Sequence, residues 1–102
     1  MGARSLIVLA LAVGCRGPDP SVRDVVVARS PEPGHQRVEL VLANAGRHGE
    51  VTLEITLRGQ GGRMVRDTRH VDIERHEQLA LSFDIAAPAD AYAATVKARY
   101  PD

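Results

Sequence analysis

Apolar and polar residues alternate along most of this chain. In the segment 51–58 the apolar residues Val51, Leu53, Ile55 and Leu57 occupy every second position, with mostly polar residues between them. Side chains of a strand point alternately to its two faces, so this period predicts a strand with one buried face. Similar patterns predict further strands, at residues 22–29, 37–42, 63–67, 71–73, 79–85 and 92–100.

Clusters of glycine, proline and other turn-forming residues separate the predicted strands. They lie at residues 30–34, 44–46, 59–62 and 87–90. Glycine adopts left-handed backbone conformations and proline fixes φ, so each cluster is expected to end a strand. Short strands at such regular spacing predict an all-β fold, a sandwich of two antiparallel sheets.

Two segments resemble the immunoglobulin-like domains of bacterial surface proteins. Residues 38–46, VELVLANAG, are similar to the strand and Asn-x-Gly turn of CARDB- and FxLYD-type domains, and residues 92–100 are similar to their last strand. The resemblance implies a single antiparallel immunoglobulin-like β-sandwich of about seven strands at residues 22–102. Such domains serve adhesion, spacing or assembly, so it also implies a role of that kind.

A short apolar run precedes the predicted strands. Arg4 places a positive charge before the aliphatic run 6–13, and Gly14 and Cys15 follow it. A helix that crosses a bilayer needs about 20 apolar residues, whereas the apolar core of a signal peptide has about 7–15. We therefore expect a signal peptide at residues 1–14 and a linker at residues 15–21.

The end of this run resembles the lipobox of bacterial lipoproteins. The four residues are Ala12-Val13-Gly14-Cys15, with alanine where that family usually has leucine. The resemblance implies cleavage before Cys15, a diacylglycerol on its thiol and fatty acylation of the new amine. Because Arg16 follows the cysteine, it also implies the outer membrane, facing the periplasm, in a Gram-negative cell and the cell surface otherwise. The alternative is an ordinary secreted protein in which Cys15 is incidental.

Composition narrows the function classes. The formal net charge is zero and aromatic residues make up 3% of the chain, which disfavours nucleic-acid binding through phosphate contacts or base stacking. The sequence lacks a P-loop, a dinucleotide-binding glycine pattern, Cys-x-x-Cys, Gly-x-Ser-x-Gly and His-Glu-x-x-His. A minimal hydrolase built on Ser82 is a remote alternative without a nucleophile elbow. We therefore expect no catalytic residue, no cofactor and no enzyme activity.

One predicted strand face carries potential metal ligands. His70, Asp72, Glu74 and His76 occupy alternate positions and would share a face. Imidazole and carboxylate groups together suit zinc, copper or nickel. Side chains two residues apart on a strand stand about 7 Å apart, which is wide for two ligands of one ion, so a solvated face without a metal is our first interpretation.

The sequence therefore favours a membrane-anchored envelope lipoprotein that acts as a non-catalytic binding, scaffold or assembly module. Its expected partners are the membrane, through lipid on Cys15, and another envelope protein. Open sheet edges near residues 25–27 or 63–74 are the expected sites of recognition. The alternative function is a periplasmic metal- or small-ligand-binding protein that uses the face of His70, Asp72, Glu74 and His76.

Overall fold

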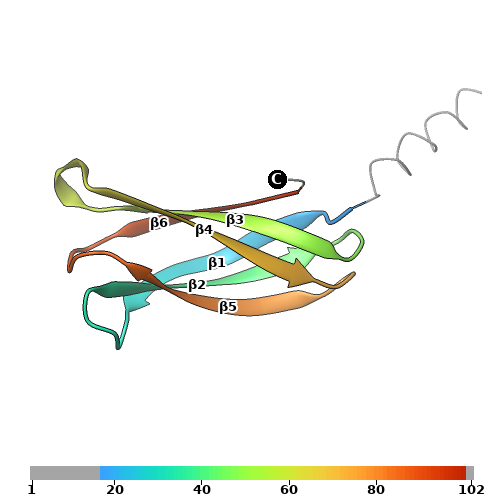
Figure 1. Cartoon of the computed structure of the whole chain (residues 1–102), viewed down its shortest axis with the longest axis horizontal. Coiled ribbons are helices and arrows are strands. Elements are labelled where there is room, and N and C mark those ends of the chain that lie inside the picture. The colour runs from blue at the N-terminus through green and yellow to red at the C-terminus, as the bar shows by residue number, and fades with distance from the viewer. Residues whose placement is uncertain (1–16, 101–102) are drawn as a thin grey trace, which may run out of the picture.

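The computed structural model describes residues 17–100, which form six strands and one short 3-10 turn (Figure 1). The predicted signal peptide 1–14 and Cys15 lie outside the described residues. The elements in chain order are β1 (Pro20–Arg29), β2 (His35–Asn44), β3 (Gly49–Arg58), η1 (Gln60–Gly62), β4 (Met64–Ile73), β5 (Gln78–Ala86) and β6 (Ala93–Arg99).

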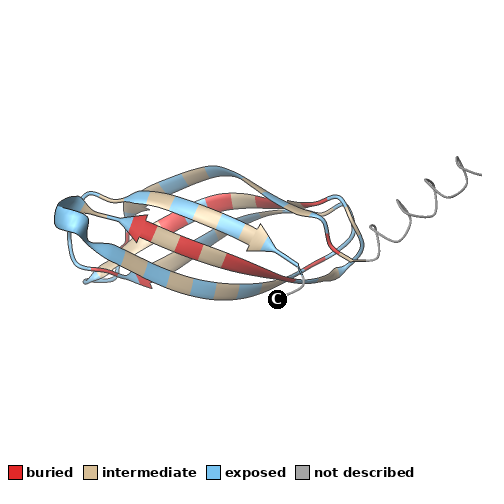
Figure 2. Cartoon of the chain, turned by 90° about the horizontal axis from the view of Figure 1, so that it is seen from above, coloured by how far each residue is buried: buried red, intermediate tan, exposed pale blue. Residues whose placement is uncertain are grey.

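The strands form two antiparallel sheets that face each other, as the sequence predicts. The first sheet has the order β1-β2-β5 and the second the order β4-β3-β6. Figure 1 shows them as two layers, with β2 and β3 as the central strands. Burial alternates along the strands in Figure 2, because one face of each sheet meets solvent.

The core lies between the two central strands. β3 is the most buried strand, and Val51, Leu53 and Leu57 have no exposed surface. These are the apolar positions whose alternation predicts a half-buried strand. The buried residues of the core are Val38, Leu40, Leu42, Val51, Leu53, Ile55, Leu57, Ile73, Ile85 and Ala87. The other apolar residues of the four edge strands pack around this core and are partly buried.

The described residues contain six strands where about seven are expected from the sequence. The predicted strands at 63–67 and 71–73 are one continuous strand, β4, which pairs along its whole length with β3. Asp67 and Arg69 have the same parity as Val65 and Val71, so these charged residues occupy inward-facing positions. The alternation of apolar residues is interrupted there, although the strand is not.

One end of the sandwich holds the start of the described chain. We call it the proximal end; it comprises residues 17–19, the β2–β3 turn 45–48 and the β4–β5 turn 74–77 (Figure 1). Tyr100 belongs to the same end, because its ring lies against Gly17. The opposite, distal end comprises residues 30–34, 59–63 and 87–92.

The first described residues are fastened to the proximal end. The amide nitrogens of Ala45 and Arg47 donate to the carbonyl oxygens of Asp19 and Gly17, at 3.0 and 3.1 Å. A Cβ atom at Gly17 would overlap the ring of Tyr100, so this close approach requires glycine. β1 begins at Pro20, and the folded domain therefore starts within the linker expected at 15–21.

Candidate functional site

The four residues of the alternative metal-binding face are divided between β4 and the turn that follows it. His70 and Asp72 lie on the outward face of β4, which ends at Ile73. Glu74 and His76 lie in the β4–β5 turn, where His76 has a positive φ of 61°. The chain no longer extends as a strand beyond Ile73, so the common face expected from parity ends there.

The structure brings Asp72 and Glu74 together with a third residue, His48. Nε2 of His48 lies 3.0 Å from Oδ2 of Asp72 and 3.4 Å from Oε2 of Glu74. One potential ligand atom from each residue lies within 4.8 Å of the others, and all three side chains are exposed. The two carboxylates converge on the imidazole although the strand spacing alone predicts that they diverge.

The β3–β4 register explains this meeting. Gly49 is opposite Ile73, and continuing the antiparallel register by one residue places His48 opposite Glu74. Asp72 is opposite Glu50, so it is the diagonal neighbour of His48. His48 lies outside the strand patterns, and only the pairing of these two strands reveals its proximity to the carboxylates.

The two carboxylates perturb the titration of His48. The hydrogen bond with Asp72, the negative charge of Asp72 and then that of Glu74 raise the pKa of His48 above its ordinary value of 6.5, and desolvation opposes them only weakly. An opposite charge within about 4–6 Å favours the protonated imidazole. A divalent cation would be favoured at the same place for the same electrostatic reason.

Asn44, which is buried, positions the loops that carry His48 and Glu74. Its Nδ2 donates to the carbonyl oxygens of Arg47 and Glu74, at 2.9 and 3.1 Å. Its Oδ1 accepts from the amides of Gly46 and Asp19, both at 2.9 Å. One side chain thus joins the β2–β3 turn, the β4–β5 turn and the first described residues. The sequence suggests a turn at Asn44 but not this connecting role.

The remaining two residues of the predicted face have other neighbours. Nδ1 of His70 lies 3.2 Å from Oγ1 of Thr52 and 3.9 Å from Oε1 of Glu50, both on β3. Nε2 of His76 accepts a hydrogen bond of 3.3 Å from Nε of Arg75. Neither histidine belongs to the group of ligand atoms around His48.

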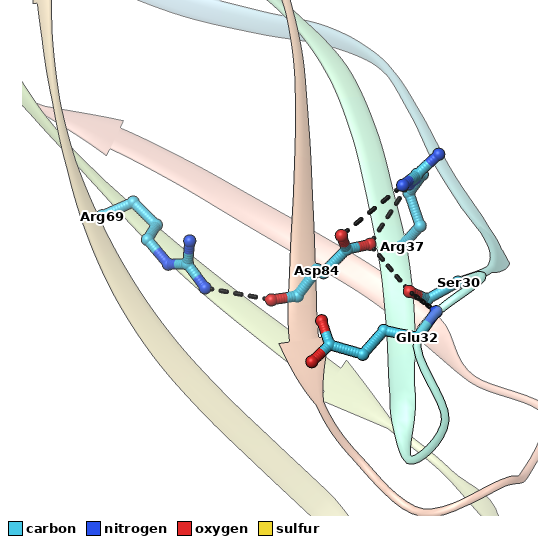
Figure 3. Close-up of polar contacts among 5 residues, drawn as sticks. All are labelled: Ser30, Glu32, Arg37, Arg69 and Asp84. Carbon is cyan, nitrogen blue, oxygen red and sulfur yellow. Dashed lines mark hydrogen bonds and ion pairs between the residues drawn. The ribbon is translucent and has the colours of Figure 1, made fainter.

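A second polar cluster, at the distal half of the sandwich, surrounds Asp84 (Figure 3). Its Oδ1 accepts hydrogen bonds from Oγ of Ser30 at 2.9 Å and Nε of Arg37 at 3.2 Å. The amide of Glu32 donates to Oγ of Ser30, at 3.1 Å. The hydrogen bond from Arg37, and after it the one from Ser30, lowers the pKa of Asp84 from its ordinary value of 3.8. Asp84 therefore holds the β1–β2 turn against β5, which is a structural role.

Ser82 lies exposed on β5 opposite Glu39 of β2, on a regular strand and not at a strand-to-helix turn.

Within residues 17–100, no helix has the length and apolar character needed to cross a membrane. No protein-family model matches the chain, and no curated protein matches it either. The immunoglobulin-like and lipobox resemblances therefore stay expectations.

Proposed function

We propose that this chain is a lipid-anchored protein of the bacterial cell envelope that binds or assembles with another envelope component and catalyses no reaction. The observation that carries the proposal is the order of residues 4–15: a basic residue, a short aliphatic run, and a small residue followed by the only cysteine. A thiol that carries diacylglycerol, next to an acylated amine, supplies more than one fatty chain. Several chains anchor a protein stably, whereas a single chain binds only weakly.

The start of the folded domain supports this anchoring. Only Arg16 separates Cys15 from Gly17, which hydrogen-bonds to the β2–β3 turn. Consecutive Cα atoms are about 3.8 Å apart, so lipid on Cys15 would hold the proximal end close to the bilayer surface. In a Gram-negative cell we place the domain at the outer membrane, facing the periplasm, and in other cells at the cell surface.

We also propose that the two sheets form a β-sandwich of the immunoglobulin-like type. In constant-type domains one sheet contains the first, second, fifth and fourth strands, and the other contains the third, sixth and seventh. The order β1-β2-β5 and the β3–β6 pairing agree with this arrangement, whereas β4 departs from it because it pairs with β3 in the second sheet. The seventh strand of these domains would pair with β6, on the side away from β3.

We propose that the partner is recognised at a sheet edge. β1 includes the expected edge segment 25–27 and β4 lies within the expected segment 63–74; each of these strands pairs with one strand only. Val26 on β1 and Met64 on β4 are 51% and 42% exposed, so each of the two edge strands carries an exposed large apolar side chain. An extended partner segment can pair with such an edge through its main chain.

Intact mass spectrometry of the protein purified from the cell envelope tests the anchor. We expect residues 1–14 to be absent and Cys15 to carry the added mass of diacylglycerol and a fatty acyl group. A Cys15→Ser variant should move to the soluble fraction, whereas Ser21→Ala, an exposed substitution on β1, should stay with membranes. A full-length, lipid-free product in the cytoplasm would contradict the proposal.

Cross-linking in intact cells tests edge recognition. Val26→Lys should abolish the cross-link to the partner if the partner binds at the edge of β1. Met64→Lys should abolish it if the partner binds at the edge of β4. A partner that both variants retain with wild-type yield contradicts recognition at these edges.

A further inference from the structure

We propose that His48, Asp72 and Glu74 form a binding site for a divalent transition-metal ion of the zinc class. This site does not depend on the lipid anchor, because all three residues belong to the folded domain. It differs from the face expected from the sequence, since His48 takes the place of His70 and His76 as the nitrogen ligand.

The separations of the potential ligand atoms suit a shared ion. Zinc lies about 2.0–2.2 Å from histidine nitrogen and carboxylate oxygen, so two ligands of a tetrahedral ion are about 3.3–3.6 Å apart. Nε2 of His48 is 3.0 Å from Oδ2 of Asp72 and 3.4 Å from Oε2 of Glu74. The two carboxylate oxygens lie within 4.8 Å of each other, so rotation of exposed side chains is enough to complete the triangle.

The chemistry of the three groups favours a transition metal over calcium or magnesium. Neutral imidazole is a good ligand for zinc, copper and nickel, whereas calcium and magnesium prefer oxygen ligands alone. Two carboxylates provide the negative charge that balances a divalent cation. Because the side chains are exposed, water has access to the remaining coordination positions.

The main chain at two of the ligands is held in place before any ion binds. Asn44 hydrogen-bonds to the carbonyl oxygens of Arg47 and Glu74, on either side of the site. The amide of Glu74 also donates to Oε1 of Glu77, at 2.9 Å. Asp72 is fixed by the pairing of β4 with β3. Ion binding therefore needs little ordering of the backbone, which lowers its entropic cost.

Isothermal titration calorimetry with zinc sulfate tests the site. The full chain should carry Cys15→Ser, because a free thiol would also bind zinc. We expect one zinc ion per chain, and weaker binding of calcium. In His48→Ala the zinc affinity should fall at least about tenfold, because even partners outside the coordination sphere change metal affinity about 10–100-fold.

Two histidine variants serve as matched controls. His35→Ala removes a histidine at the distal end, and His70→Ala removes the histidine of β4 next to the site; both should keep the zinc affinity of the parent chain. Circular dichroism should show that each variant is folded. Zinc binding that survives His48→Ala, or that disappears in His70→Ala, overturns the assignment, as does no heat at millimolar zinc or calcium binding as tight as that of zinc.

Nuclear magnetic resonance identifies the nitrogen ligand without a substitution. On addition of zinc, the imidazole ¹⁵N signals of His48 should shift, with Nε2 as the coordinated atom. The signals of His35 and His76 should stay where they are. A shift at His76 or His70 with none at His48 would overturn the assignment.

Discussion

Arg69 of β4 donates a hydrogen bond of 3.1 Å to the main-chain carbonyl oxygen of Asp84 in β5. β4 and β5 are edge strands of different sheets, so this side chain bridges the two sheets at their open side. The guanidinium of Arg69 also lies 5.3 Å from the centre of the Phe83 ring, and it pairs with Asp67 at 2.8 Å.

Replacing Arg69 by alanine should destabilise the domain by about 2 kcal/mol. The variant loses a hydrogen bond from a charged donor, worth about 1.5–3 kcal/mol, and the cation–π contact with Phe83. Urea unfolding measures the change. Arg66→Ala, an exposed arginine on the opposite face of β4, is the control and should change stability by less than about 0.5 kcal/mol. Equal effects in the two variants would contradict the bridging role.

Asn44→Asp should cost about 2 kcal/mol or more, although the side chains have nearly the same shape. Aspartate can still accept from Asp19 and Gly46, but it places a carboxylate against the carbonyl oxygens of Arg47 and Glu74, where the amide now donates. Urea unfolding gives the loss of stability. A variant as stable as the wild type would contradict the connecting role of Asn44.

Leu53→Ala should destabilise the domain by about 2–5 kcal/mol, because a fully buried side chain of the central strand is replaced by a cavity. Small domains have a total stability of about 5–15 kcal/mol, so the variant is expected to unfold at a much lower urea concentration. Val26→Ala on β1, where the side chain is 51% exposed, should cost less than about 1 kcal/mol. A similar loss in both variants would contradict the position of the core.

Asp72→Asn should lower the pKa of His48 toward its ordinary value. The hydrogen bond with Asp72 is the largest cause of the raised pKa, and Glu74 retains part of the effect. Because the folded-state pKa is raised, this contact stabilises the fold below pH 6.5, and the stabilisation is lost as the pH rises through the folded-state value. An NMR titration of the His48 ring measures the shift; an identical titration in both proteins would contradict it.

Asp84→Asn should reduce stability at neutral pH but not in acid. Arg37 and Ser30 lower the pKa of Asp84, so its stabilisation is present above about pH 3.8 and is lost as the pH falls through the lower folded-state value. Thermal unfolding at several pH values should show that the gap between wild type and variant closes in acid. A gap of the same size at every pH would contradict the role of this charge.

The strands β2 and β3 were predictable from the sequence because the inward positions of the segments 37–42 and 51–58 are all apolar. β2 and β3 contain every residue of the expected strands 37–42 and 51–58. β4 was expected as two strands, since Asp67 and Arg69 interrupt its apolar face. Their burial is compensated by their mutual ion pair and by the bond of Arg69 to Asp84, neither of which a period along one strand can reveal.

The candidate metal site was only partly predictable for a related reason. Asp72 and Glu74 were named only in the alternative metal-binding interpretation, because they occupy alternate positions of one predicted strand. His48 lies far away in the chain and meets them only through the β3–β4 register. Parity also grouped His70 and His76 with them, but it could not show that the strand ends at Ile73 or that His70 contacts Thr52.

The hydrogen bond between Gly17 and the β2–β3 turn has a consequence for any lipid tether at Cys15. Because only Arg16 separates Cys15 from the folded domain, a lipid tether at Cys15 would have almost no slack. The domain would therefore contact the lipid headgroups and tilt only within a narrow range. A partner would have to come within the height of one small domain of the lipid surface to bind it.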